Sequence, residues 1–189
     1  MAMDERDAIA RLQRGDIGGL ETLVHLHHAR AVRSAYLVTR DLEVAQDVAQ
    51  AAFLNAYEHI HQFDPTRPFG PWFLKSVLRE AVKAASRRAR QVQLDASAPE
   101  AMGISADRLE DPDVGPAALW AQRETAQAVM AALGALAPHE RAAIVQRYYL
   151  GLSEAEMSRA LDCPPGTVKS RLHAAREHLR GLLQPLLVP

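Results

Sequence analysis

Cationic side chains at helical spacing near the C-terminus form the strongest candidate for a binding site in this sequence. Ser153 stands three residues before Glu156, which is the spacing of a capping box and predicts the start of a short helix. Pro164 and Pro165 end that helix and favour the first turn of the next one. Behind an apolar stripe, the second helix turns four polar side chains outward: Lys169, Ser170, His173 and Arg176. The pattern is typical of a helix-turn-helix whose second helix enters the major groove of DNA; the alternative is a helical hairpin with a solvated basic face.

A second group of cations lies between residues 67 and 90. This stretch carries seven cations and one anion, a net charge of +6, which suits it to neutralising phosphates. Residues 91–116 carry six anions and one cation, a net charge of −5, together with several prolines and glycines. We interpret 91–116 as an acidic, flexible linker that separates a module at 1–90 from a module at 117–189.

The segments that carry these side chains are all predicted to be helices. Apolar residues recur at helical spacing, and no segment alternates as a strand would. Three prolines between residues 64 and 71 block helix continuation there. The sequence therefore predicts an all-α fold of two small helical domains, with helices over 7–13, 18–38, 42–63, 69–90, 117–136 and 138–150 ahead of the helix-turn-helix.

Composition limits the classes of function that the chain can have. Of its 189 residues, 48% are hydrophobic and 24% are charged, which is the balance of a globular protein. The net charge is −1, so DNA binding must rest on local segregation of charge or on help from a partner. The single cysteine, Cys163, excludes a disulfide framework and a cysteine-based metal site.

Several other kinds of site are also not expected. His25, His27 and His28 are clustered, but no cysteine or well-spaced carboxylate completes a metal site around them, so we expect neither a metal nor a cofactor. Neither a glycine-rich phosphate loop nor a nucleophile–base set is visible, which argues against an enzyme. The charged start lacks a signal peptide, and no apolar run approaches the ~20 residues of a membrane span, so the sequence predicts a cytoplasmic protein without membrane insertion.

Three segments, in this order, resemble motifs of the bacterial RNA polymerase sigma factors of the extracytoplasmic-function type, in the sigma-70 family. Residues 47–54 (DVAQAAFL) look like the segment with which that family grips the polymerase clamp. Residues 69–74 (FGPWFL) look like its promoter-melting stretch, and residues 162–171 (DCPPGTVKSR) look like its −35 recognition segment. The resemblance covers nearly the whole chain and implies sigma region 2 at 1–90 and sigma region 4 at 117–189.

The resemblance implies three partners: core RNA polymerase, bound at the clamp of its largest subunit and at its flap, promoter DNA, and an anti-sigma factor. The implied core-binding residues are Asp47, Gln50 and Phe53. By helical spacing alone, Val48, Phe53 and Leu54 suit the domain's own hydrophobic core. Ala51 stands where the family usually has Glu, which removes one charged contact.

For −10 DNA, the resemblance implies six residues: Arg67, Phe69, Trp72, Lys75, Arg79 and Lys83. Phe69 is expected in the stiff loop from 64 to 71, where it is the better candidate for contact with a flipped base. Trp72 is either a core anchor or a platform for an unpaired base. Arg87 and Arg88 are expected to neutralise phosphates of the upstream duplex. Because Arg79 replaces the Asn of many members, the −10 sequence preference does not transfer.

For −35 DNA, the resemblance likewise implies six residues: Thr167, Lys169, Ser170, Arg171, His173 and Arg176. Ala174 stands where the family commonly has Arg, and an alanine cannot make the bidentate contact with guanine, so we expect weaker or altered −35 reading. For Arg176 the alternative is an internal ion pair with Glu177. The acidic linker is implied to thread the polymerase cleft, with a solvated spacer as its alternative.

Two other functions remain open at this point. A stand-alone helix-turn-helix regulator would bind DNA as a dimer, but it leaves the segment 47–54 without a role. An interaction protein that sequesters polymerase would need neither the cations of 67–90 nor the basic face around Lys169.

Overall fold

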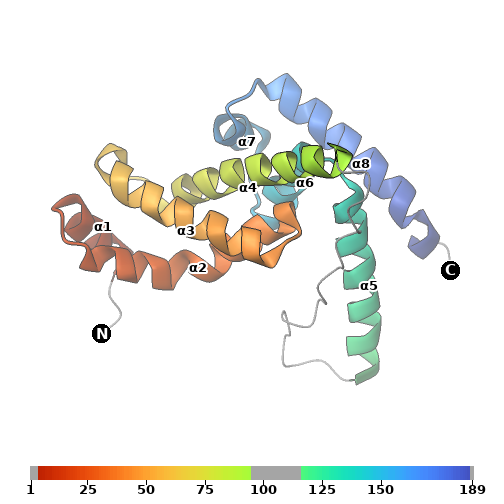
Figure 1. Cartoon of the computed structure of the whole chain (residues 1–189), viewed down its shortest axis with the longest axis horizontal. Helices are drawn as coiled ribbons and strands as arrows, with labels where there is room; N and C mark the ends of the chain where they lie inside the picture. The colour runs from red at the N-terminus through yellow and green to blue at the C-terminus, as the bar shows by residue number, and fades with distance from the viewer. Residues whose placement is uncertain (1–3, 95–115, 188–189) are drawn as a thin grey trace. The chain divides into compact units, whose positions relative to one another are not determined.

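A computed structural model describes residues 4–94 and 116–187 of the chain (Figure 1). The chain divides into two compact units, residues 1–90 and residues 91–189. Within the described residues every regular element is a helix, which confirms the all-α prediction. Most of the predicted acidic linker, residues 95–115, lies outside the described residues.

The first unit contains four helices: α1 (Glu5–Gln13), α2 (Gly18–Thr39), α3 (Leu42–His59), which runs into the short 3-10 helix η1 (Ile60–Gln62), and α4 (Phe69–Leu94). Local chemistry sets several of their ends. The side chain of Asp4 caps α1 by accepting from the backbone N–H of Arg6 at 3.3 Å. Arg40 ends α2 in the left-handed conformation, with φ of 61°. Asp41 then caps α3 through the N–H of Val44 at 3.2 Å.

The core of the first unit forms where α1, α2, α3 and α4 turn their apolar faces toward one another. Leu12, Leu23, Phe73 and Leu78 are almost completely buried there. The crossing of α1 and α2 depends on Gly19, because a Cβ at that position would lie 2.2 Å from the carbonyl oxygen of Ala8. The glycine thus lets α1 lie directly against the start of α2.

The second unit contains α5 (Pro116–Ala135), α6 (Pro138–Ile144), the π-helical segment η3 (Val145–Tyr149), α7 (Glu154–Leu161) and α8 (Pro165–Leu187). The helix predicted over 138–150 is therefore two elements. Its second half is wider, since the N–H of Leu150 bonds to the carbonyl of Val145 at 3.0 Å. Gly151, with φ of 71°, then turns the chain toward α7.

One buried carboxylate ties α6 to α8 in this unit. Glu140 Oε2 accepts from the N–H of Ala137 and lies near His178 Nδ1, at 3.2 Å in both cases. Arg141, the next residue, donates from Nη2 to the carbonyl of Leu136 at 2.9 Å, which secures the turn between α5 and α6. These contacts fix the helix that supports α8. Among the residues that the structure describes, no helix is long and apolar enough to cross a membrane.

Candidate nucleic-acid interface

The start of α7 has the capping box that the sequence predicts. Ser153 Oγ accepts from the N–H of Glu156 at 3.3 Å, and Glu156 Oε2 accepts from the Ser153 N–H at 2.8 Å and from its hydroxyl at 2.6 Å. These hydrogen bonds from Ser153 lower the pKa of the Glu156 carboxyl. Asp162 ends α7 in the left-handed conformation, and α8 begins at Pro165, as expected of a proline in a first turn.

The turn between α7 and α8 is held by a small apolar core. Ala143, Met157, Val168 and Leu172 form this core, with Leu152 and Cys163 packed against it. The hydroxyl of Ser158 donates to the Cys163 carbonyl at 2.6 Å, so the turn is tied back to α7. Cys163 is therefore a small residue packed into this turn.

The opposite side of α8 is open to solvent. Lys169, Ser170, His173 and Arg176 are exposed, whereas Thr167 and Arg171 are half-buried. Arg176 Nε donates to the carbonyl of Leu172 at 3.1 Å. Glu177, the alternative partner for Arg176, instead accepts from Arg180 Nη1 at 2.5 Å. The face thus combines cations and hydrogen-bonding groups on one rigid helix.

A second cationic face runs along α4. Lys75, Arg79 and Lys83 are all exposed. Glu80 lies between them: its Oε1 is 2.9 Å from Lys83 Nζ and 3.5 Å from Arg79 Nε. Glu80 therefore offsets part of the positive charge that α4 would offer to phosphates.

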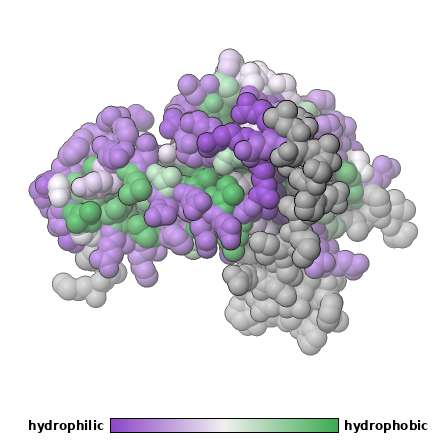
Figure 2. Space-filling model, in the orientation of Figure 1, coloured by the Kyte–Doolittle hydropathy of each residue, from purple (hydrophilic) through white to green (hydrophobic). Residues whose placement is uncertain are grey.

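Hydrophilic residues predominate on the face of the molecule visible in Figure 2, apart from its grey atoms.

An aromatic cluster closes the base of the loop that leads into α4. The rings of Phe63 and Phe69 meet edge to face with centroids 5.6 Å apart, and Trp72 lies 5.0 Å from Phe63. Phe69 also stacks on Phe73 at 5.5 Å. His27, from α2, packs 5.3 Å from Phe69. The two ends of the loop are thus joined in the core.

The loop itself, residues 64–68, is stiffened by Asp64. Its Oδ1 accepts from the N–H of Thr66 at 3.0 Å and from the Thr66 hydroxyl at 2.6 Å, and these bonds lower the pKa of the carboxyl. Asp64 Oδ2 lies 3.3 Å from Arg67 Nε, and the Arg67 side chain is 77% exposed. The loop therefore projects a cation from a fixed turn.

A third surface is the outward face of α3. Asp47 and Gln50 are exposed and lie one helical turn apart. Leu54, which follows on the same face, is 54% exposed. Phe53 points the other way, 5% exposed, with its ring 4.4 Å from that of Phe73. The face combines a carboxylate, an amide and an uncovered leucine, a composition suited to protein–protein contact.

Family models match both units of the chain. The model described as Sigma-70 region 2 matches residues 23–91, which include α3 and the loop with most of α4. The model described as Sigma-70, region 4 matches residues 126–179, which include the helix-turn-helix. The two matches fall on the segments whose faces are described above.

Full-length relatives agree with these matches. The chain is 30% identical over 189 residues to the ECF RNA polymerase sigma-E factor of Escherichia coli K12, covering 95% of this chain and 94% of that protein. It belongs to the extracytoplasmic-function sigma factors of the sigma-70 family. It is also 27% identical to the ECF RNA polymerase sigma factor SigW of Bacillus subtilis, over 98% of this chain and 100% of SigW. The RNA polymerase sigma-H factor of Pseudomonas aeruginosa is 29% identical, over 97% of this chain and 95% of that protein.

Two solved structures share the fold of this sigma factor. CnrH, solved in complex with the cytosolic domain of CnrY, matches with a TM-score of 0.63 and 23% identity, over 96% of this chain and 99% of CnrH. RpoE of Bartonella quintana, solved with the anti-sigma factor NepR, matches with a TM-score of 0.65 and 22% identity, over 87% of this chain and 96% of RpoE. Sigma factors direct RNA polymerase to promoters, and the family is not an enzyme family.

The structure corrects the expected position of Phe69 in this sigma factor. The sequence placed Phe69 in the loop as a contact for a flipped base, but α4 begins at Phe69 and the side chain is 1% exposed. The loop ends at Pro68 and not at Pro71 as expected, so Phe69 falls on the buried side of the first turn of α4. Trp72 belongs to the same cluster but is only half-buried.

Two neighbouring residues of α3, Phe53 and Leu54, differ in burial from what was expected of them. Phe53 was implied as a core-polymerase contact, but its ring lies in the unit's own core against Phe73, as its helical spacing indicated. Leu54 was expected in the core and is exposed. The spacing in the sequence already places Leu54 on the same helical face as Asp47 and Gln50, because it follows Asp47 by seven residues and Gln50 by four.

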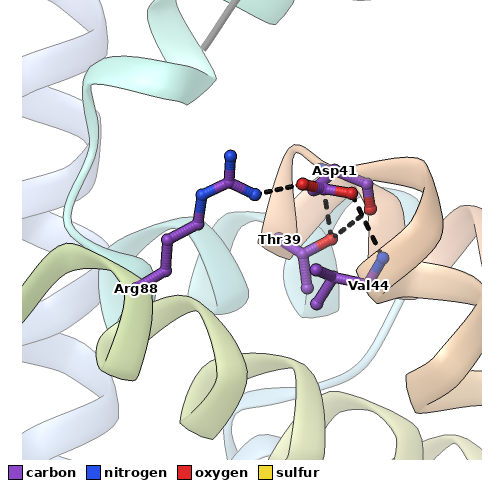
Figure 3. Close-up of polar contacts among 4 residues, drawn as sticks. All are labelled: Thr39, Asp41, Val44 and Arg88. Atoms are coloured by element: carbon purple, nitrogen blue, oxygen red, sulfur yellow. Dashed lines mark hydrogen bonds and ion pairs between the residues drawn. The ribbon is translucent and has the colours of Figure 1, made fainter. Parts of the chain in front are cut away.

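Arg88 makes an internal ion pair that the sequence did not indicate. The sequence assigned it to upstream phosphates, but its Nη1 binds Asp41 Oδ2 at the start of α3 (Figure 3). The hydrogen bond from Arg88 is the main cause of the lowered pKa of the Asp41 carboxyl. Arg88 thus contributes to the scaffold through this ion pair, although it is exposed on the same helix as Arg87.

The histidine cluster of α2 is divided between surface and core. His25 and His28 are exposed, whereas His27 packs on Phe69 and its Nε2 lies 2.7 Å from Glu5 Oε1. Across the ranges that the structure covers, no group of three His, Cys, Asp or Glu side chains is arranged to hold a metal ion.

Proposed function

We propose that this sigma factor uses three separate faces: α3 for core RNA polymerase, α4 with the loop 64–68 for −10 DNA, and α8 for −35 DNA. The observation that carries the proposal is that each of these helices buries one side and exposes, on the other, polar groups that lie within a region matched by a family model. Each face is rigid because the buried side is fixed by packing.

The polymerase contact is proposed for Asp47, Gln50 and Leu54. The carboxylate and the amide offer hydrogen-bond acceptors and a donor, and the exposed leucine supplies apolar area that a clamp surface can cover. Ala51, also exposed, adds no charge to this face. We propose that the second unit contacts the polymerase flap, so that both units are held at a fixed separation.

The −10 contact is proposed for Arg67 and Trp72 at the loop and for the cations of α4, Lys75, Arg79 and Lys83. The cations lie on one exposed face, which suits the backbone of a duplex or a separated strand. Trp72, which is half-buried, offers an aromatic ring for stacking with an unpaired base. Phe69 supports this site from the core and is not proposed to touch DNA.

The −35 contact is proposed for the outward side of α8. Lys169, Ser170 and His173 would reach base edges, and Thr167, Arg171 and Arg176 would hold the phosphate backbone. Ala174 is half-buried beside His173 and provides no hydrogen bond, so a base read by arginine in other members is not read in the same way here.

Further partners follow from this role. The structures that share the fold were solved with an anti-sigma factor, NepR, or with the cytosolic domain of CnrY. We infer that an anti-sigma protein restrains this chain as well. We also infer that this chain acts in the cytoplasm, where RNA polymerase is found. In this proposal the polymerase forms every phosphodiester bond, and this chain catalyses no step.

Run-off transcription with purified bacterial core polymerase tests the proposal. A library of promoter fragments is transcribed with core alone, with core plus this protein, and with core plus a Lys169→Ala, His173→Ala double variant. We expect transcripts that require the protein and begin downstream of a shared two-element motif. The double variant should lose the −35 element from that motif while binding core polymerase as tightly as the wild type.

Two other outcomes would contradict the proposal. Stable binding to core without any transcript would indicate a protein that sequesters polymerase. Tight DNA binding without core, and no complex with core, would indicate a stand-alone regulator. With a net charge of −1, the free chain is expected to bind DNA weakly.

A further inference from the structure

Helix α1 lies outside the matched family region, yet it reaches the loop that is proposed to hold −10 DNA. The region 2 match begins at residue 23, whereas α1 spans Glu5–Gln13. Two polar side chains of α1, Glu5 and Gln13, make long-range contacts to α2 and to the segment before the loop. The first contact supports the end of the loop, and the second supports its beginning.

Gln13 fixes the point where the chain enters the loop. Its Nε2 donates to the carbonyl of Phe63 at 3.1 Å and to the carbonyl of Ile60 at 3.3 Å. The carbonyl of Phe63 lies just after the end of η1, whereas the carbonyl of Ile60 also accepts from the N–H of Phe63 at 3.1 Å. Both hydrogens of one amide group are thereby used on the backbone immediately before Asp64.

Glu5 supports the other end of the loop through His27. The Glu5 carboxylate lies 2.7 Å from His27 Nε2, and the His27 ring packs on Phe69 and on Phe73. A Cβ at Gly70 would lie 3.6 Å from His27 Cε1, so the imidazole sits directly against the first turn of α4. The start of α4 therefore rests on a side chain that α1 holds in place.

The two supported ends are joined by the contact between Phe63 and Phe69, and the loop between them is short and internally bonded. The hydrogen bonds from Thr66 to Asp64, together with that from the N–H of Arg67 to the Asp64 carbonyl at 3.0 Å, leave the loop little freedom of its own. Its direction is consequently set by where its first residue leaves the core. The hydrogen bonds that fix that point come from Gln13.

We infer that Gln13 is a positioning residue for −10 DNA: it sets where the loop 64–68 leaves the domain and therefore where Arg67 meets the separated strand. This inference rests on the proposed function of the loop. Gln13 acts through the backbone of Phe63 and does not itself touch DNA. Loss of its two hydrogen bonds should allow the loop to move while α3 and its polymerase face stay in place.

Holoenzyme made with three variants tests this role. Gln13→Met keeps the length of the side chain and removes the donor, whereas Gln13→Lys keeps a donor that can reach the same carbonyls. Gln62→Met makes the same chemical change at an exposed amide of η1 and is the matched control. The probe is a labelled non-template oligonucleotide that carries the −10 sequence obtained from run-off transcription. Its affinity is measured by anisotropy, alongside the affinity of each variant for core.

We expect Gln13→Met to bind the oligonucleotide about fivefold more weakly, with unchanged core affinity. Gln13→Lys should recover an affinity within about twofold of the wild type. Gln62→Met should bind the oligonucleotide with the same affinity as the wild type. The inference is overturned if Gln13→Met binds as the wild type does, if Gln13→Lys is weakened equally, or if Gln62→Met loses as much. A parallel loss of core affinity would also overturn it, because Gln13 would then only stabilise the unit.

The wild-type holoenzyme separates this inference from the function on which it rests. If it fails to bind the oligonucleotide while initiating transcription, the proposed role of the loop is wrong. If it binds and the Gln13 variants do not differ from it, only the positioning role of Gln13 is wrong.

Discussion

Asp41 and Arg88, 47 residues apart in the chain, form an ion pair that joins the start of α3 to the second half of α4 (Figure 3). One oxygen of the carboxylate caps α3 through the N–H of Val44, and the other binds the guanidinium. Thr39 completes the corner, since its hydroxyl donates to the Asp41 carbonyl at 3.0 Å. The pair thus links the helix of the proposed polymerase face to the helix of the proposed −10 face.

Replacement of Asp41 by Asn isolates this ion pair, because Asn still caps α3. We expect Asp41→Asn to lower the free energy of unfolding by about 0.5–1 kcal/mol at pH 7, a modest value because Arg88 is partly exposed. Since the folded-state pKa of Asp41 is lowered, the pair stabilises the fold above the unfolded pKa of about 4. This contribution disappears as the pH falls through the lower folded-state pKa. Urea unfolding followed by circular dichroism from pH 7 to pH 2.5 measures it, and a difference between the two proteins that stays constant with pH would contradict the assignment.

The exposed Leu54 should matter for polymerase binding and not for folding. We expect Leu54→Ala to weaken the complex with core polymerase about tenfold. A few side chains at the centre of an interface carry most of the binding free energy. Leu26→Ala is the matched control, since Leu26 is 49% exposed on α2. Fluorescence titration with labelled core measures both affinities. Equal affinities for the two variants, or a lowered unfolding midpoint for Leu54→Ala, would remove Leu54 from the interface.

Glu80 should restrain the cations of α4. In Glu80→Gln the ion pairs to Arg79 and Lys83 are lost, and we expect promoter affinity of the holoenzyme to rise about two- to fivefold at low salt. The slope of log affinity against log salt should steepen by up to about one, and the gain should vanish at high salt. Glu21→Gln makes the same charge change at an exposed site on α2. A gain of the same size in Glu21→Gln would show that net charge, and not the release of these cations, is responsible.

Lys169 and His173 should act only when a −35 element is present. We expect Lys169→Ala and His173→Ala each to reduce initiation from a complete promoter several-fold through lost groove and phosphate contacts. On a promoter with a scrambled −35 element, both variants should match the wild type. Gln184→Ala, at an exposed position nearer the end of α8, is the control. Equal losses on the two promoters would assign these residues to polymerase binding.

Local chemistry made the helix-turn-helix predictable from the sequence. The capping box of Ser153 and Glu156, the proline at the start of α8 and the stripe of Val168 and Leu172 each depend on neighbours within a few residues. Such interactions form in the same way whatever the rest of the chain does. The outward position of Lys169 and His173 follows from them.

Tertiary packing decided the positions that the sequence left open or placed wrongly. Whether Phe69 or Leu54 is buried depends on which helices pack against its face, and helical spacing alone does not select between neighbouring faces. The partners of Arg88 and Gln13 lie about fifty residues away in the chain, on Asp41 and Phe63. Local patterns in the sequence were enough to predict the helical elements, their order, the division into two units and the helix-turn-helix. Only the packed fold selected which face of each helix meets solvent and which polar groups are held inside, because those choices depend on contacts between residues distant in sequence.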